Sequence, residues 1–112
     1  KDNRYFDLKL KYFFELDRDL SRPLVVWGAG RNGKDFIMAL KKYEKEIHWV
    51  CDNERKIGKD IFDLQIHHFS SIKSLNRPQI IVVIAEPSAK FEIECHFIEW
   101  GKKPIEDFWF FI

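Results

Sequence analysis

Residues 23–40, Pro-Leu-Val-Val-Trp-Gly-Ala-Gly-Arg-Asn-Gly-Lys-Asp-Phe-Ile-Met-Ala-Leu, decide the fold of this chain. A short apolar run, Leu24–Trp27, leads into three glycines, Gly28, Gly30 and Gly33, and apolar residues then recur at helical spacing. In a strand–turn–helix unit the first glycine allows a tight turn, and the second lets a phosphate approach the backbone. The third lets the helix press against the strand, and the N–H groups at the helix start face the anion. The stretch therefore predicts a phosphate-binding turn.

The other residues of this turn are assigned from the same geometry. Arg31 and Lys34 would flank the phosphates and add charge-assisted contacts, while Ala29 and Asn32 complete the loop. If the turn binds nothing, Arg31 and Lys34 are simply exposed residues at the start of a helix.

A second apolar segment, residues 47–51, ends in Asp52 and Asn53. In dinucleotide-binding folds an acidic residue about 20 residues after the last glycine accepts hydrogen bonds from a ribose diol. Asp52 would repel a 2′-phosphate, which favours NAD or an unphosphorylated ribose over NADP. The alternative is that Asp52 and Asn53 only begin a turn after the strand, as these residue types often do.

The glycine loop also nearly matches a P-loop, because Gly28 and Gly33 stand at the right distance before Lys34. A P-loop needs Ser or Thr at the next position to place a hydroxyl on magnesium, and this chain has Asp35 there. A carboxylate would fail as that ligand and would lie near the phosphates. The sequence therefore argues against ATP or GTP hydrolysis.

Length and composition set further limits. The chain has 112 residues, enough for one domain, and its net charge of +1 argues against a nucleic-acid-binding surface. No apolar run approaches 18 residues, so no membrane span is expected, and a cytoplasmic location is the default. Cys51 and Cys95 lie too far apart in sequence to suggest a metal or redox pair, and no metal site is predicted. The chain begins without methionine, so we expect it to be a piece of a longer protein.

The N-terminal segment is predicted to be an amphipathic helix over about residues 3–20, with apolar residues on more than one face. We expect one side to lie on this domain and another on a missing upstream domain or a second copy of the chain. The domain organisation is then a helix or linker, residues 1–21, and a nucleotide-binding domain, residues 22–112. The alternative is a helix sunk entirely into its own core.

The remaining pattern is strand, helix, strand, irregular excursion, strand, short helix, strand, helix, strand. The excursion leads to a short strand at 61–66, the most apolar strand is 80–85, a helix runs through 87–99, and an aromatic strand ends the chain at 108–112. This order predicts an α/β, Rossmann-like, three-layer domain with a short parallel sheet and the first strand in the centre. Its ligand crevice would lie between the glycine loop and residues 85–88. There Glu86 would act as a carboxylate or bond the N–H groups of the next helix.

From Leu24 to Ile112 the sequence resembles a small Rossmann-like domain of bacterial polysaccharide assembly proteins. The resemblance rests on Trp27–Lys34, Trp49–Asn53, Lys56–Lys59 and the aromatic end, Glu106–Phe111. Such domains form the nucleotide-sugar-binding half of hexapeptide-repeat sugar acyltransferases and a C-terminal appendage of family-2 glycosyltransferases. The resemblance implies phosphate at the three glycines, a ribose or base at Asp52, and a missing glycosyltransferase domain upstream. The acyltransferase β-helix is absent, and catalysis by this piece alone is not implied.

Other chemical motifs fall in the wrong place. The acidic pair of Asp17-Arg-Asp19 precedes the first strand, so it lies outside the expected ligand crevice. His67 and His68 are adjacent in a strand, so their side chains would face opposite sides and could not readily bind one ion. No catalytic residue is assigned, and three functions remain open. They are an accessory module that binds a nucleotide, nucleotide sugar or NAD, a ligand-free interaction domain that forms oligomers, and the NAD-binding half of an oxidoreductase.

Overall fold

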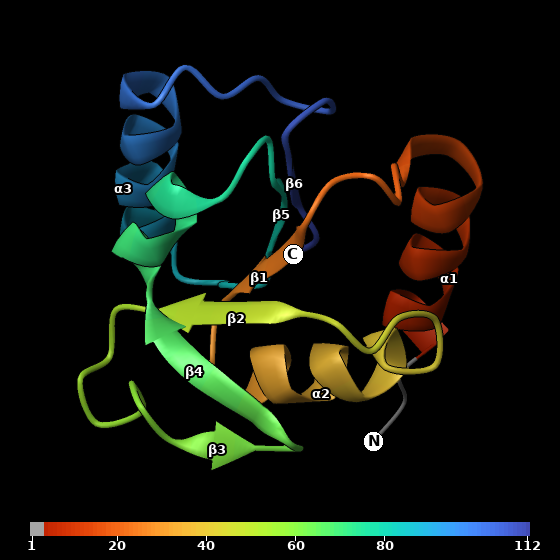
Figure 1. The fold of residues 1–112 in the computed structure, drawn as a ribbon, viewed down its shortest axis with the longest axis horizontal. Helices are drawn as coiled ribbons and strands as arrows, with labels where there is room; N and C mark the ends of the chain where they lie inside the picture. The colour runs from red at the N-terminus through yellow and green to blue at the C-terminus, as the bar shows by residue number, and fades with distance from the viewer. Residues whose placement is uncertain (1–3) are drawn as a thin grey trace.

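The computed structural model describes residues 4–112 and contains one six-stranded sheet with the strand order β3-β4-β2-β1-β5-β6 (Figure 1). The strands are β1 (Leu24–Trp27), β2 (His48–Cys51), β3 (Asp60–Ile61), β4 (Leu64–His68), β5 (Gln79–Val82) and β6 (Phe108–Phe110). Every neighbouring pair is parallel except β3 with β4. Without β3, the order corresponds to the first five strands of the 3-2-1-4-5-6 Rossmann sheet. The predicted α/β class and the central position of the first strand are confirmed.

The two central strands are buried on both faces. All four residues of β1 and all four of β5 are inaccessible to solvent, as expected for the continuous apolar runs of a covered parallel sheet. One face packs against α2 (Arg31–Leu40) and α1 (Arg4–Tyr12), and the other against α3 (Pro87–Glu99) and the 3₁₀-helix η2 (Phe69–Ser74) (Figure 1). The domain therefore has the three predicted layers.

The N-terminal helix contributes to the core of this domain. It continues from α1 into a π-helical segment, η1 (Phe13–Asp17), and so ends three residues before the expected boundary; the expected start at residue 3 lies outside the described residues. Phe6, Leu10 and Phe13 are buried, and the rings of Phe6 and Phe36 meet edge to face at 5.2 Å. The opposite face is exposed, with Leu8 at 57%. One side of the helix thus lies on the domain, as expected.

The segment after β2 differs from the prediction. Residues 61–66 were expected as one strand, but Phe62 and Asp63 form a two-residue turn that joins β3 to β4 as an antiparallel hairpin. Both turn residues have positive φ, 55° and 64°, which is the twist that two-residue hairpins favour. The strand expected at 80–85 ends at Val82; the N–H of Val83 still donates to Trp27 at 3.0 Å, and Ile84 and Ala85 follow outside the sheet.

Candidate functional site

The glycine loop is held in place by contacts with β2 and with α2, the helix that follows the loop. Gly28 has φ of +135°, a conformation that residues with a side chain rarely adopt, and its N–H donates to the carbonyl of Val50 at 2.9 Å. The indole Nε1 of Trp49 donates to the Gly28 carbonyl at 2.7 Å. A Cβ atom on Gly33 would lie 2.0 Å from that same carbonyl oxygen. Gly33 therefore allows α2 to start directly against the loop.

Gly30 differs from the other two glycines because its free side faces open space. It precedes α2 in an extended conformation, and a Cβ atom built on it would meet no atom within 4 Å. The first N–H groups of α2 lack partners within the helix, which gives this end a partial positive charge. The loop thus leaves space beside Gly30, at the end of α2 where these N–H groups lie.

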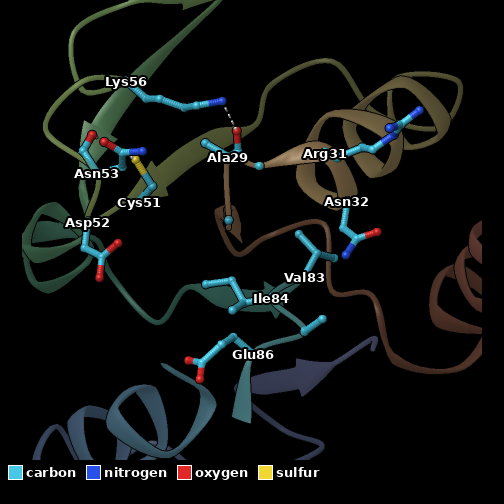
Figure 2. A pocket seen from close by; sticks show the side chains of 13 residues that line it. Ala29, Arg31, Asn32, Cys51, Asp52, Asn53, Lys56, Val83, Ile84 and Glu86 are labelled. Atoms are coloured by element: carbon cyan, nitrogen blue, oxygen red, sulfur yellow. Dashed lines mark hydrogen bonds between the residues drawn. The ribbon is translucent and has the colours of Figure 1, made fainter. Parts of the chain in front are cut away.

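A cavity of about 320 Å³ lies in front of this loop (Figure 2). Its wall combines three segments that follow the carboxyl ends of β1, β2 and β5, namely Gly28–Asn32, Cys51–Asn53 with Lys56, and Val83–Glu86. The switch between the two directions of strand order lies between β1 and β5, where open α/β sheets bind their ligands. Of the predicted site residues, Gly33 and Lys34 alone do not line the cavity.

Asp52 and Asn53 stand on the β2 side of the cavity. The side chain of Asn53 accepts a hydrogen bond from the N–H of Arg55 at 3.0 Å, and its carbonyl accepts from the N–H of Lys56 at 2.9 Å. Asn53 therefore begins a turn, as the alternative interpretation held. The exposed carboxylate of Asp52 makes no hydrogen bond or ion pair with any residue in the described range 4–112, so it is free to accept one from a ligand.

Glu86, on the β5 side, is occupied as the cap of α3. Its carboxylate accepts from the N–H of Ala89 and from the hydroxyl of Ser88, each at 2.7 Å. The Ser88 hydroxyl and the backbone N–H of Ala89 lower the pKa of Glu86. Of the two roles considered for this residue, the structure shows the one in which it bonds the N–H groups at the helix start.

Lys56 belongs to the cavity, although the sequence interpretation did not assign it to the site. Its Nζ donates to the Ala29 carbonyl at 2.8 Å, which brings the cation across from the β2 loop to the glycine loop (Figure 2). Burial, and next the neighbouring Lys34, lower the pKa of Lys56. Lys56 lay within a segment that carried the resemblance, but only the folded chain places it beside Ala29.

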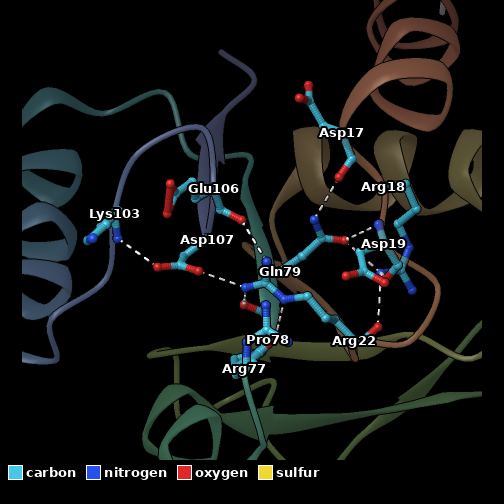
Figure 3. A network of polar contacts seen from close by, with 10 residues as sticks. All are labelled: Asp17, Arg18, Asp19, Arg22, Arg77, Pro78, Gln79, Lys103, Glu106 and Asp107. Carbon is cyan, nitrogen blue, oxygen red and sulfur yellow. Dashed lines mark hydrogen bonds and ion pairs between the residues drawn. The ribbon is translucent and has the colours of Figure 1, made fainter.

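The opposite edge of the sheet carries a polar network with a structural role (Figure 3). Arg18 donates to Glu44 at 2.9 and 2.6 Å and to Gln79 at 2.7 Å, while Arg22 pairs with Asp107 at 2.7 Å. These bonds join the segment after η1 to the start of β5 and to the loop before β6. The Asp17-Arg-Asp19 motif is therefore part of a structural connection at the amino ends of the strands.

Within residues 4–112, no cluster of three or more His, Cys, Asp or Glu side chains is arranged to hold a metal ion. His67 stacks on His48 at 4.6 Å between ring centroids, while His68 bonds Ser70. No helix of the described range combines the length and apolar character that a membrane crossing requires.

No protein-family model and no curated protein matches the sequence. Solved structures match at the level of the fold. RSP, a Rex-family repressor, is 17% identical, with a TM-score of 0.59 over 93% of this chain and 51% of that one. RSP in complex with beta-NADH is 17% identical, with a TM-score of 0.57 over 80% of this chain and 44% of that one. UDP-D-quinovosamine 4-dehydrogenase from Vibrio fischeri is 15% identical, with a TM-score of 0.56 over 73% of this chain and 74% of that one.

The fold is Rossmann-like. Identities of 15–17% carry the comparison no further than the fold, and the chain spans only 44–51% of the length of RSP. The predicted fold class is thereby confirmed by neighbours as well as by topology.

Proposed function

We propose that this chain binds a nucleotide, with the phosphates at the glycine loop and the ribose at Asp52. The observation that carries the proposal is the pairing of Gly30, open at the start of α2, with the free carboxylate of Asp52 across the same cavity. Backbone N–H groups at a helix start bind phosphate, and a carboxylate after the second strand binds a ribose diol. The negative charge of Asp52 disfavours a 2′-phosphate, so NAD is preferred to NADP.

The size of the cavity favours the mononucleotide part of a ligand. At about 320 Å³ it lies at the lower end of the range for small-molecule sites. The sheet likewise supplies one complete half of a Rossmann fold and only two strands, β5 and β6, of the other. A nucleoside diphosphate therefore fits as the bound part of either NAD or a nucleotide sugar.

Two ligand classes are supported by the neighbours. The complex of RSP with beta-NADH favours NAD, and the name of the Vibrio fischeri enzyme favours a UDP-sugar. Among residues 4–112 no histidine, tyrosine or serine lines the cavity, and Glu86 is engaged as a helix cap, so we infer a binding module that is not catalytic alone. The NAD-binding half of an oxidoreductase is the second candidate.

We further propose that the module serves a bacterial glycosyltransferase in surface polysaccharide synthesis, with the catalytic domain upstream of α1 in the same protein. This proposal is supported by the resemblance of Leu24–Ile112 to such appendages and by the exposed apolar side of α1, which suits contact with another domain or a second copy. The three solved structures named above are not glycosyltransferases by name.

Thermal unfolding with a ligand panel tests the proposal. The panel contains NAD, NADP, ADP, UDP and several UDP-, GDP- and dTDP-sugars. A ligand at one hundred times its dissociation constant adds about 2.7 kcal/mol of stability and raises the Tm by roughly 10 °C in a domain of this size. Gly30→Leu should fold, because its side chain enters open space, and should lose the shift. Asn76→Leu, an exposed residue outside the cavity lining, should keep it.

The outcomes separate the candidate functions. A shift with one ligand class, lost in Gly30→Leu, supports nucleotide binding and identifies the class. No shift with any ligand would contradict binding and favour a ligand-free interaction domain, which sedimentation of the same sample would test. Retention of the shift in a folded Gly30→Leu variant would place the ligand elsewhere.

A further inference from the structure

Lys56 is held at the glycine loop by contacts within the protein. The turn that carries it is fixed by N–H bonds from Lys56 and Ile57 to the Asn53 carbonyl, at 2.9 and 3.1 Å. The N–H of Gly58 then donates to Ile66 at 2.7 Å, which attaches the turn to β4. Since the Ala29 carbonyl takes one of the three N–H donors of the ammonium group, the others remain for a ligand.

The charge of Lys56 is not neutralised within the described range. No ion pair between described residues includes Lys56. Lys34 lies close enough to Lys56 for the two like charges to interact. Lys34 comes from the first turn of α2 and does not line the cavity, whereas Lys56, from the loop after β2, lines it and reaches the glycine loop. An anion bound at the loop would relieve their repulsion.

We propose that Lys56 holds the phosphate groups of the ligand from outside the glycine loop. This inference rests on the proposed nucleotide binding and defines the ligand class further. Backbone N–H groups at a helix start serve a single phosphate well, whereas an additional cation favours a ligand with more phosphate charge. The site is then selective for a nucleoside diphosphate group over a monophosphate, and for a monophosphate over a nucleoside.

Calorimetric titration of the full chain with ADP, AMP and adenosine, and with UDP, UMP and uridine, tests this. The wild type should bind the diphosphate of one series most tightly. Lys56→Met should weaken diphosphate binding by about tenfold to a hundredfold, the usual strength of a hydrogen bond to a charged group. Nucleoside binding should not change. Lys56→Arg should retain the preference. Lys45→Met, an exposed lysine outside the cavity lining, is the matched control.

Failure of this inference is distinguishable from failure of the proposed function. If the wild type binds nucleotides but Lys56→Met keeps the ratio of diphosphate to nucleoside affinity, the role of Lys56 is wrong while nucleotide binding stands. If the wild type binds none of the six compounds and shows no thermal shift with the ligand panel, both are wrong. Circular dichroism of each variant establishes that it is folded.

Discussion

At the scale of single residues, the glycines of the loop have different surroundings, so the same substitution should change the free energy of unfolding by different amounts. Gly33→Ala places a Cβ atom 2.0 Å from the Gly28 carbonyl oxygen, and both groups are backbone, so α2 must move away from the loop. We expect a loss of at least about 2 kcal/mol in the free energy of unfolding, measured by urea denaturation. Gly30→Ala, which meets no atom within 4 Å, should cost less than about 1 kcal/mol. Equal losses would contradict this assignment.

His48 is the residue expected to make stability depend on pH near neutrality. Its Nε2 lies 2.7 Å from the Ser71 hydroxyl, and burial, followed by the neighbouring ring of His67, lowers the pKa of His48. A histidine whose pKa is lower in the folded state stabilises the fold above its unfolded pKa of about 6.5, and this contribution is lost as the pH falls.

The Tm should therefore decrease between about pH 7 and pH 5, and less so in His48→Gln, whose amide can still bond Ser71. Differential scanning calorimetry over that range measures both proteins. The stabilisation from Glu86, whose pKa is lowered, is present throughout this range, and it is lost only in more acidic solution, as the pH falls below the ordinary pKa of a carboxyl group. Identical pH profiles for the two proteins would show that His48 is not responsible.

At the scale of elements, α1 belongs to the core that covers one face of the sheet. Leu10 is fully buried in the same cluster as Phe36 and Phe111, whereas Leu8 is 57% exposed. Leu10→Ala should lower the free energy of unfolding by about 2–5 kcal/mol through the cavity that it leaves. Leu8→Ala should change it by less than about 0.5 kcal/mol in the isolated chain. A small effect of Leu10→Ala would mean that α1 is a detachable linker.

At the scale of the whole molecule, Arg18 links three parts of the chain that are distant in sequence. Its side chain is 2% exposed and contacts Glu44 after α2 and Gln79 at the start of β5. Arg18→Met should cost about 2–4 kcal/mol, because the Glu44 carboxylate and the Gln79 amide lose a charged partner. Lys42→Met removes an exposed pair with Asp7 at 3.7 Å and should change stability by less than about 0.5 kcal/mol. Urea denaturation of both variants decides whether the network stabilises the fold.

The sequence by itself determined the central architecture. Local patterns carry that information, because an apolar run of four residues, a glycine triplet and a helical repeat each act within a few residues of the chain. They were sufficient to predict β1, α2, β2, β5 and α3, the parallel sheet and the place of the cavity. They also assigned Gly28 to the tight turn, Gly33 to the contact with the helix, and Asp52 to the cavity wall.

Only the tertiary structure decided how groups from different elements meet. Lys56 reaches Ala29 across 27 residues, and no local pattern marks such a contact. The β3–β4 hairpin depends on the left-handed conformation of Phe62 and Asp63. Asp adopts this conformation more often than most residues, but Phe does not, so the pair did not predict the turn. Glu86 was assigned two roles until the bonds from Ser88 and Ala89 selected one. Pairing across long sequence separations depends on the packing of the whole chain, and that packing determines which side chains of the cavity remain free for a ligand.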